Sequence, residues 1–419
     1  MRDVHSDEVR APALRMEGFE GEWDRKPFGT LGQIIGGTTP STAVPEYWGG
    51  AVHWFTPAEL SEDGSGEVSE STRSITDRAV KEAGLRVLPP GTVLITSRAS
   101  IGHVAVTTTP ATTNQGFASL IPSSPAATWF VYNWVLAHKR QLEVEASGST
   151  FLEISGRKLA SYETAVPSPE EQSALGSFFS ELDALVNATS NRARSLTSLK
   201  KTMLVKMFPQ GTASTPEVRF EGFEGDWGTR SLGELGSIKT GPFGSTLHAE
   251  DYVSHGTPII TTEHFKTGNL TTYLPTLPQV SAKDRARLAG YSLTEGDIVF
   301  SRVGSVDVNA VVRPEHEGWL FSGRVLRVRL ETEVDYEYLH WCLLTPVLRE
   351  DITSRAVGQT MPSINTRILA DTVVPVPSLS EQQAIGSYFR SLDALIEAEQ
   401  RKLDTLRNLK SALLTQMFV

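Results

Sequence analysis

The stretch PSPEEQSALGSFFSELDALVNATSNRARSLTSLKKTMLVKMF occupies residues 167–208, and it returns as PSLSEQQAIGSYFRSLDALIEAEQRKLDTLRNLKSALLTQMF at residues 377–418. The two copies align without a gap at an offset of 210, with 19 identical residues in 42 positions. A second repeat precedes each copy, as EGFEGEW at Glu17–Trp23 and EGFEGDW at Glu221–Trp227. The chain is therefore internally duplicated, and the sequence predicts two halves that share one fold.

Each copy of the long repeat is predicted to form one helix. No proline follows the opening stop, and Glu171 and Glu381 fall in the first turn, where the helix dipole favours anions. Apolar residues recur every seven positions with companions three further on, which is the pattern of a coiled-coil seam. The rows are Leu175, Leu182, Leu196 and Met203 with Phe178, Leu185 and Leu199, and then Ile385, Leu392, Leu406 and Leu413 with Tyr388, Leu395 and Leu409.

A helix of about 38 residues is about 57 Å long, which exceeds what a small domain needs for its own core. Two similar helices offer each other matching seams, so we expect an antiparallel pair that spaces two modules. The plainer interpretation, a buried stripe on each helix, is compatible with this. Polar residues that interrupt the seams either set its register or face a partner, and they are Thr189, Arg192, Glu399 and Lys402, to which Arg194 is added as a partner-binding candidate.

Length and composition limit the class of protein. At 419 residues the chain is too long for one growing core, so several domains are expected. Cys342 is the only cysteine, which excludes an internal disulfide and any multi-cysteine metal site. The spacing of the nine histidines also argues against a metal site. No apolar run approaches the roughly 20 residues that span a bilayer, and no signal peptide is recognisable, so a cytoplasmic location is expected.

The expected fold class is α+β, with a pseudo-two-fold internal repeat. Regions rich in Val, Ile, Thr, Gly and Pro, with short strand-like runs such as Thr92–Thr96 and Asp297–Ser301, indicate β-rich mixed domains beside the helices. The expected boundaries are a first β-rich domain at 1–165, a helical spacer at 166–212, a second β-rich domain at 213–375 and a second helical spacer at 376–419.

Further landmarks come in the same order in both halves. They are a glycine-led loop, a strand that ends in Ser-Arg, a Gly-x-Thr turn, and a proline stop followed by Glu-Gln. The first half has Gly37–Ser41 with Tyr47, Trp48 and Trp54, then Ser97-Arg98, Gly148–Thr150 with Ile154-Ser155, and Glu171-Gln172. The second has Gly241–Ser245 with Leu247-His248 and Asp251-Tyr252, then Ser301-Arg302, Gly358–Thr360 with Ile364-Asn365, and Glu381-Gln382.

In this order, and over nearly its whole length, the chain resembles the specificity subunit of a type I restriction-modification enzyme. The resemblance implies two target recognition domains, each of which reads one half of a split, asymmetric DNA sequence. It also implies two methyltransferase (M) subunits docked on the helices, which carry S-adenosylmethionine and the adenine chemistry, and restriction (R) subunits that translocate and cut. This chain would then hold no cofactor and no catalytic residue.

Apart from Gln115 and His264, the candidate DNA-binding residues lie in these landmarks, and the candidates have structural alternatives. Arg98 and Arg302, taken as equivalent strand ends, suit guanine or phosphate but also ion pairs. Trp54 and Phe265 suit base stacking or a core, and the glycine loops suit phosphate approach or tight turns. The set is Thr38, Ser41, Trp54, Ser97, Arg98 and Gln115 in the first half, and Ser245, His264, Ser301, Arg302 and Gln359 in the second.

Two other classes of protein stay open. An adenine methyltransferase would carry an Asn/Asp-Pro-Pro-aromatic loop, but the one Pro-Pro here, Pro89-Pro90, follows leucine and precedes glycine. A Walker-type phosphate loop is also missing, although nuclease signatures are too short to exclude. The net charge of −10 leaves open a scaffold or inhibitor of the same architecture that does not bind DNA.

Overall fold

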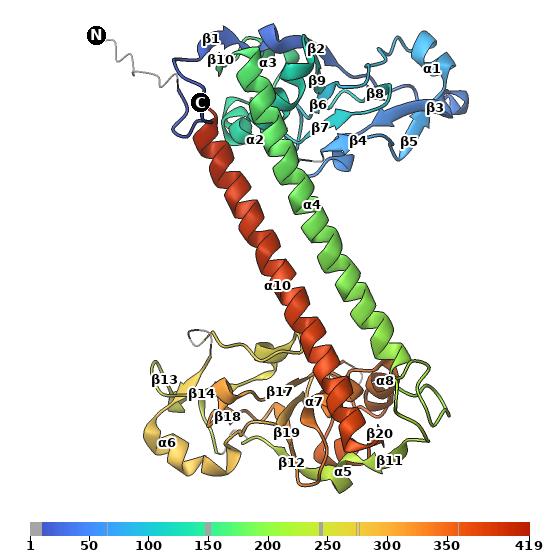
Figure 1. Ribbon diagram of the computed structural model, residues 1–419, viewed down its shortest axis with the longest axis vertical. Helices are drawn as coiled ribbons and strands as arrows, with labels where there is room; N and C mark the ends of the chain where they lie inside the picture. The colour runs from blue at the N-terminus through green and yellow to red at the C-terminus, as the bar shows by residue number, and fades with distance from the viewer. Residues whose placement is uncertain are drawn as a thin grey trace. The chain divides into compact units, whose positions relative to one another are not determined.

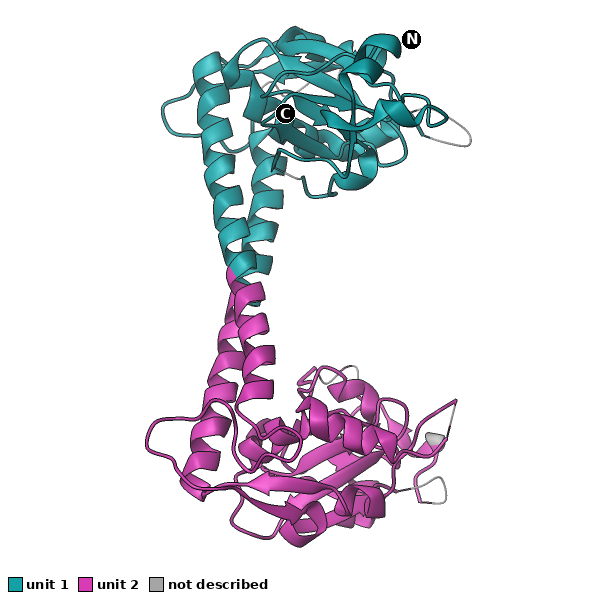
Figure 2. Ribbon diagram, turned by 90° about the vertical axis from the view of Figure 1, so that its right-hand side faces the viewer, with its two compact units in different colours: residues 1–191, 400–419 teal, residues 192–399 magenta. Residues whose placement is uncertain are grey.

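The computed structural model describes residues 11–64, 66–146, 152–242, 246–273, 275, 277–358 and 360–419. The chain divides into two compact units, which are coloured separately in Figure 2. Unit 1 comprises residues 1–191 and 400–419, and unit 2 comprises residues 192–399. Each unit therefore combines one β-rich domain with the start of one long helix and the end of the other.

Each unit has a larger sheet at its centre (Figure 1). In unit 1 the strand order is β2-β9-β6-β7-β4, and in unit 2 it is β12-β19-β16-β17. The central strands are buried on both faces, as their runs of Val, Ile, Leu and Phe require. The strands are β2 Gly32–Gly36, β4 Glu67–Val68, β6 Val93–Ile95, β7 Val104–Thr107 and β9 Ala118–Pro122, and then β12 Gly236–Thr240, β16 Ile298–Ser301, β17 Asn309–Val311 and β19 Val325–Leu330.

A smaller sheet lies beside each larger one. Its order is β5-β3-β8 in unit 1 and β13-β15-β14-β18 in unit 2, and in both the long central strand pairs antiparallel on one side and parallel on the other. A short helix follows in each, capped by Thr76 or Ser281. The elements are β3 Trp48–Phe55, β5 Arg73–Ile75, β8 Ala111–Thr113 and α1 Asp77–Glu82, and then β13 Tyr252–Val253, β14 Thr257–Ile260, β15 Gln279–Val280, β18 Leu320–Phe321 and α6 Ala282–Arg287.

Helices cover the larger sheets and bury the main core of each unit. In unit 1 the helix is α2, and in unit 2 the corresponding chain forms α7 and α8. A two-stranded ribbon, β1-β10 or β11-β20, leads from each domain to its long helix. The bounds are α2 Pro125–Glu145, α3 Gly156–Ala160, β1 Asp24–Pro27 and β10 Glu163–Val166, and then α5 Leu232–Leu235, α7 Tyr336–Leu343, α8 Pro346–Ser354, α9 Thr366–Ala370, β11 Gly228–Ser231 and β20 Val373–Val376.

The two predicted long helices are α4, Pro169–Lys206, and α10, Leu379–Met417. Within unit 1, Lys410 Nζ lies 2.6 Å from Asp183 Oδ1. Within unit 2, Lys200 pairs with Asp393, and Arg192 Nε lies 3.0 Å from Glu399 Oε1. Partner numbers fall along α10 as they rise along α4, so the helices run antiparallel in unit 2. The α+β fold class with its repeat is confirmed.

The seam differs from the predicted one in a single respect. The companion leucines placed three residues on are exposed, with 43% for Leu185 and 49% for Leu395. The buried companions come four residues on instead, and include Phe179, Ala193 and Leu403. Because a helix has 3.6 residues per turn, residues three and four positions further on both lie close to the apolar stripe. Which of the two is buried depends on what the helix packs against.

Each long helix ends inside the core of a unit other than the one in which it begins. Phe418, directly after the last residue of α10, packs on Trp23 and Phe130 in unit 1. Phe208 of α4's end packs on Trp227 and Tyr338 in unit 2. The tryptophan that ends each repeated Glu-Gly-Phe-Glu-Gly segment therefore packs against the end of the long helix that enters the unit.

A buried carboxylate at each helix start is held by an arginine. Arg15 Nε and Nη2 donate to the Glu171 carboxylate at 2.8 and 2.7 Å. Arg219 donates to Glu381 in the same way, at 2.7 and 2.8 Å. The two carboxylate side chains are 2% and 1% exposed, so the predicted first-turn acids serve as buried ion-pair partners as well as dipole partners.

Candidate nucleic-acid interface

Three segments that are far apart in the chain meet at one edge of the unit 1 domain. They are the loop after β2, the turn between β8 and β9, and the end of β6. Thr38 N donates to Thr113 O at 2.9 Å, and Ser97 N donates to Gly116 O at 2.7 Å. Thr39 Oγ1 donates to Gln115 Oε1 across the same edge. The fold thus brings together candidates that the sequence identified separately.

Two indole groups hold the loop after β2 in place. Trp54 Nε1 donates to Thr38 O at 3.0 Å, and Trp48 Nε1 donates to Ser41 O at 3.3 Å. The rings of Trp48 and Trp54 meet edge to face with centroids 5.0 Å apart. Thr38, Ser41 and Gln115 are exposed on this support, so their hydroxyl and amide groups face solvent.

The unit 2 domain repeats this edge with different side chains. Arg302 N donates to Arg324 O at 2.9 Å, as Ser97 N does to Gly116 O, and Ile364 N donates to Arg302 O as Ile154 N does to Ser97 O. The backbone position of Arg302 is therefore that of Ser97. Arg302 Nη1 donates to Gly323 O at 3.1 Å, and Arg324 beside it is exposed.

The predicted equivalence of Arg98 and Arg302 is wrong by one residue. Arg98 forms an isolated bridge with Glu153, and its counterpart in unit 2 is Val303, which bridges Ser363. Side chains alternate between the faces of an extended strand, so a one-residue shift turns the two arginines to opposite faces. The shared letters Ser-Arg suggested an alignment that the hydrogen bonds do not support.

Arg98 adopts the ion-pair alternative. Its Nη2 lies 2.9 Å from Glu153 Oε1, with side chains 45% and 41% exposed. An exposed pair of this kind contributes about 0–1 kcal/mol, so it does not withdraw the guanidinium from solvent or from a phosphate.

Four other candidates are buried and cannot touch DNA in this conformation. Trp54 is 3% exposed, Ser97 4% and Ser301 2%, and Phe265 is fully buried. For Trp54 and Phe265 the core interpretation holds, because their rings pack in apolar clusters. Ser97 and Ser301 are corrected to positioning residues of the edge.

His264 is a capping residue at the surface. Its Nδ1 accepts from Thr261 N at 3.0 Å, which caps a short 3-10 turn over Thr262–Phe265. It also lines a shallow pocket of about 810 Å³ with Lys266 and Asn269. Ser245 and Gln359, like the turn at 148–150, lie outside the described residues.

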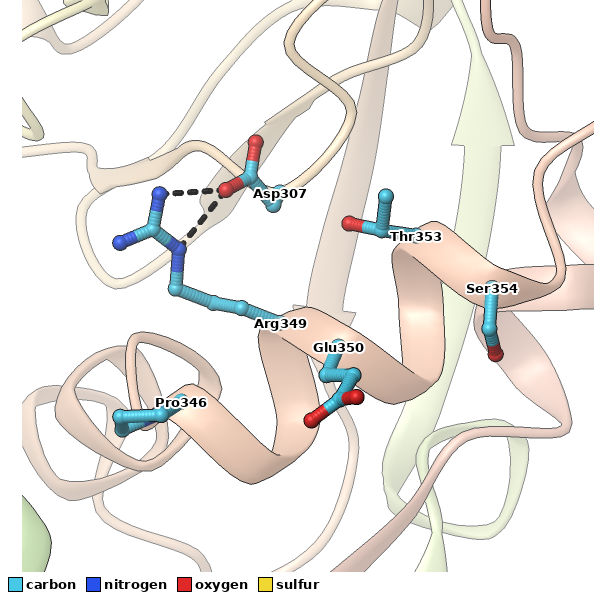
Figure 3. Close-up of a pocket in the computed structure, with 6 residues that line it drawn as sticks. All are labelled: Asp307, Pro346, Arg349, Glu350, Thr353 and Ser354. Carbon is cyan, nitrogen blue, oxygen red and sulfur yellow. Dashed lines mark hydrogen bonds and ion pairs between the residues drawn. The ribbon is translucent and has the colours of Figure 1, made fainter. Parts of the chain in front are cut away.

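A second pocket, of about 450 Å³, lies on α8 (Figure 3). Arg349 Nε donates to Asp307 Oδ2 at 2.8 Å at one end of it, and Glu350, Thr353 and Ser354 line the helix side. None of the DNA-binding candidates lines this pocket. Among the described residues no group of three or more His, Cys, Asp or Glu side chains is arranged for a metal ion.

The partner-binding candidates lie on the helix pair in unit 2 and just beyond it in α10. Arg192 and Glu399 bind each other across the pair, and the Glu399 side chain is only 13% exposed. Arg194 and Lys402 are exposed. The sequence pattern assigned four leucines to the seam that the structure shows exposed on the surface of the helix pair. They are Leu185 and Leu409 in unit 1 and Leu199 and Leu395 in unit 2. Over the described part of the chain, none of the helices is both apolar and long enough to cross a bilayer.

Comparisons with known proteins agree with this architecture. The specificity subunit of the type I restriction enzyme MjaIX from Methanocaldococcus jannaschii is 27% identical over 415 residues, covering 94% of this chain and 92% of that protein. The EcoR124I/EcoR124II specificity subunit of Escherichia coli is 28% identical over 176 residues, or 40% of this chain and 43% of that protein. The crystal structure of a type I restriction-modification S subunit from M. genitalium shares the fold, with a TM-score of 0.59 and 17% identity over 98% of this chain and 99% of that one.

The family model described as the type I restriction modification DNA specificity domain matches twice, at residues 20–197 and 224–408. These two matches follow the internal repeat and together cover most of the chain. The chain therefore belongs to the family of type I restriction-modification specificity subunits.

Proposed function

We propose that this chain is the sequence-reading subunit of a type I restriction-modification system and that its two domains each read one half of a split, asymmetric DNA target. The observation that carries the proposal is the repeated edge. Both domains hold the strand end at this edge with the same two backbone bonds, and the side chains there are Thr38, Gln115 and Arg98 in one and Arg302 and Arg324 in the other. One frame with two different surfaces suits two different half-sites.

The chemistry would come from partners. Two methyltransferase subunits and the restriction subunits would supply the cofactors and the reacting groups, and this chain would hold no cofactor of its own. The exposed leucines support two copies of one partner, because each unit presents one such pair, Leu185 with Leu409 and Leu199 with Leu395. Arg194 and Lys402 would add polar contacts at the rim. DNA as the substrate also argues for the cytoplasm.

The central test is a methylation assay with the purified chain and its methyltransferase subunit, separately and together. We expect no methyl transfer by the chain alone, and sequence-specific adenine methylation by the mixture. Methylome mapping in cells with and without the gene would return the target directly. Methyl transfer by the isolated chain would refute the non-catalytic assignment.

A second test concerns the helices as the ruler between half-sites. Inserting one heptad into both α4 and α10 adds about 10 Å of helix while preserving the seam. The unread gap in the methylated sequence is expected to lengthen, whereas the two half-sites stay the same. An unchanged gap in a folded, active variant would show that the helices do not set it.

A further inference from the structure

The exposed edge of unit 1 contains an arginine that lies flat on an aromatic ring. The guanidinium carbon of Arg73 is 3.6 Å from the centroid of the Trp48 ring and 5.3 Å from that of Trp54. Trp54 lies directly opposite Arg73 in the β3-β5 register. Cation–π contact at this distance restricts the rotation of the long side chain and fixes the plane of its N–H groups.

The backbone beneath Arg73 is also fixed. Ser71 Oγ accepts from Trp54 N at 2.9 Å and donates to Arg73 O at 2.6 Å, so one hydroxyl ties the start of β5 to β3. The side chain is nevertheless exposed. No carboxylate of the described residues forms an ion pair with it, in contrast to Arg78 nearby, which pairs with Glu82 at 2.9 Å.

The same cluster supports the loop that carries the exposed hydroxyl groups. The indole N–H groups of Trp48 and Trp54 donate to Ser41 O and Thr38 O. Arg73 therefore stacks on the same tryptophans that hold the loop of the predicted DNA-binding edge. The described residues of unit 2 do not repeat this arrangement, because the strand position of Trp54 is occupied there by the buried Ile259. Any role of the stacked arginine therefore belongs to one half-site.

We propose that Arg73 is a specificity-determining residue of the unit 1 domain and that it binds a guanine edge with its two-pronged donor face. The proposal rests on the proposed function. A phosphate contact needs charge but little orientation, whereas a base contact needs a fixed donor plane, and the Trp48 ring provides one. A guanidinium that is already ordered loses less freedom when it binds.

The test uses the full-length chain assembled with its methyltransferase subunit and a randomised duplex DNA library, from which bound sequences are recovered. Arg73→Ala is expected to relax discrimination at one base pair by about 10- to 100-fold, with the other half-site unchanged. Arg73→Lys keeps the positive charge but loses the paired N–H donors of the guanidinium. It should therefore relax discrimination at the same base pair while the salt dependence of binding is retained. Arg86→Ala, which removes an exposed arginine bound to Gln33 Oε1 instead of a ring, should leave the recovered sequence unchanged.

The outcomes separate the alternatives. Uniform weakening with an unchanged sequence would make Arg73 a phosphate contact and overturn the inference. A loss of thermal stability in Arg73→Lys, with binding and sequence unaltered, would make it a structural residue and also overturn it. If the wild-type assembly enriches no sequence, the proposed function fails, and this inference fails with it.

Discussion

The two recognition domains share a frame but present different chemistry on it. The turn at the end of the central strand shows this at the level of single residues. Ala99 in unit 1 has a φ of 60°, and the corresponding Gly304 in unit 2 has a φ of 85°. Ala99 is the sole non-glycine residue with positive φ in the described chain, so unit 1 holds strain where unit 2 holds none. The two units thus share the backbone conformation of this turn, while the residues that occupy it differ.

The largest expected effect is on the rate at which the buried Cys342 thiol is chemically labelled. This rate measures the opening of the unit 2 core alone. Burial raises the pKa of the Cys342 thiol to about 12, so thiolate is scarce at pH 8. We expect labelling by a disulfide reagent to be at least about 1,000-fold slower in the folded chain than in denaturant, because it requires opening of a core with several kcal/mol of stability. Fast labelling of the native chain would show that this core is open. Variants in unit 1 serve as controls and should leave the rate unchanged.

The buried ion pairs test whether the two helix starts are equivalent. Removing either carboxylate, as Glu171→Ala or Glu381→Ala, deletes two charge-assisted hydrogen bonds, while Arg15 and Arg219 keep backbone carbonyl partners, and should cost about 1.5–3 kcal/mol. Glu171 also accepts from Trp23 Nε1 at 3.2 Å, so its loss should cost about 1 kcal/mol more. Calorimetry of the full chain measures both, and Glu181→Ala, at an exposed site on α4, is the control. Equal costs would mean that the indole contact contributes nothing.

The one-residue shift between the arginines predicts unequal effects on DNA binding. Arg302→Ala should weaken binding by about 1–3 kcal/mol, because its side chain is longer than that of Ser97 and reaches Gly323, next to the exposed Arg324. Arg98→Ala should weaken binding by less, about 1 kcal/mol, because a phosphate would have to share the exposed guanidinium with Glu153. Titration of target duplex by the full assembly compares the two. If Arg98→Ala proves the more damaging, the assignment of faces is reversed.

The smallest expected effect is on the free energy of unfolding, from variants at the positive-φ position occupied by Ala99 in unit 1 and Gly304 in unit 2. Gly304→Ala should destabilise unit 2 by about 1 kcal/mol, because nothing crowds the new methyl group and only backbone strain is added. Ala99→Gly should stabilise unit 1 by about 0.5–1 kcal/mol by removing that strain. Chemical denaturation of each variant measures the changes. A destabilised Ala99→Gly would mean that the extra freedom of glycine in the unfolded chain outweighs the strain.

The sequence predicted what repetition and periodicity encode. The duplicated helices, their antiparallel match and the β-rich domains follow from residues that recur in fixed order. It did not predict which of two near-stripe positions is buried, so Leu185 and Leu395 were placed in the seam although Phe179 and its equivalents fill it. That choice depends on what the helix contacts.

The candidate site was predicted in location more than in detail. Thr38, Gln115 and the Ser97 strand end were chosen from separate segments, and the fold joins them. The burial of Trp54 and the register of Arg98 depend on pairings with Thr112 and Glu153, which lie 58 and 55 residues further along the chain, and a local pattern does not contain them. Arg73 carried no local signal at all, because its significance comes from the ring beneath it.

The exchange of helix ends between units has a consequence for synthesis on the ribosome. Residues 192–399 are contiguous, so every part of unit 2 has been synthesised before residues 400–419 are made. Unit 1 includes that last segment, and the Phe418 ring completes its aromatic cluster. The core of the domain that is translated first therefore stays incomplete until residues 400–419 have been made.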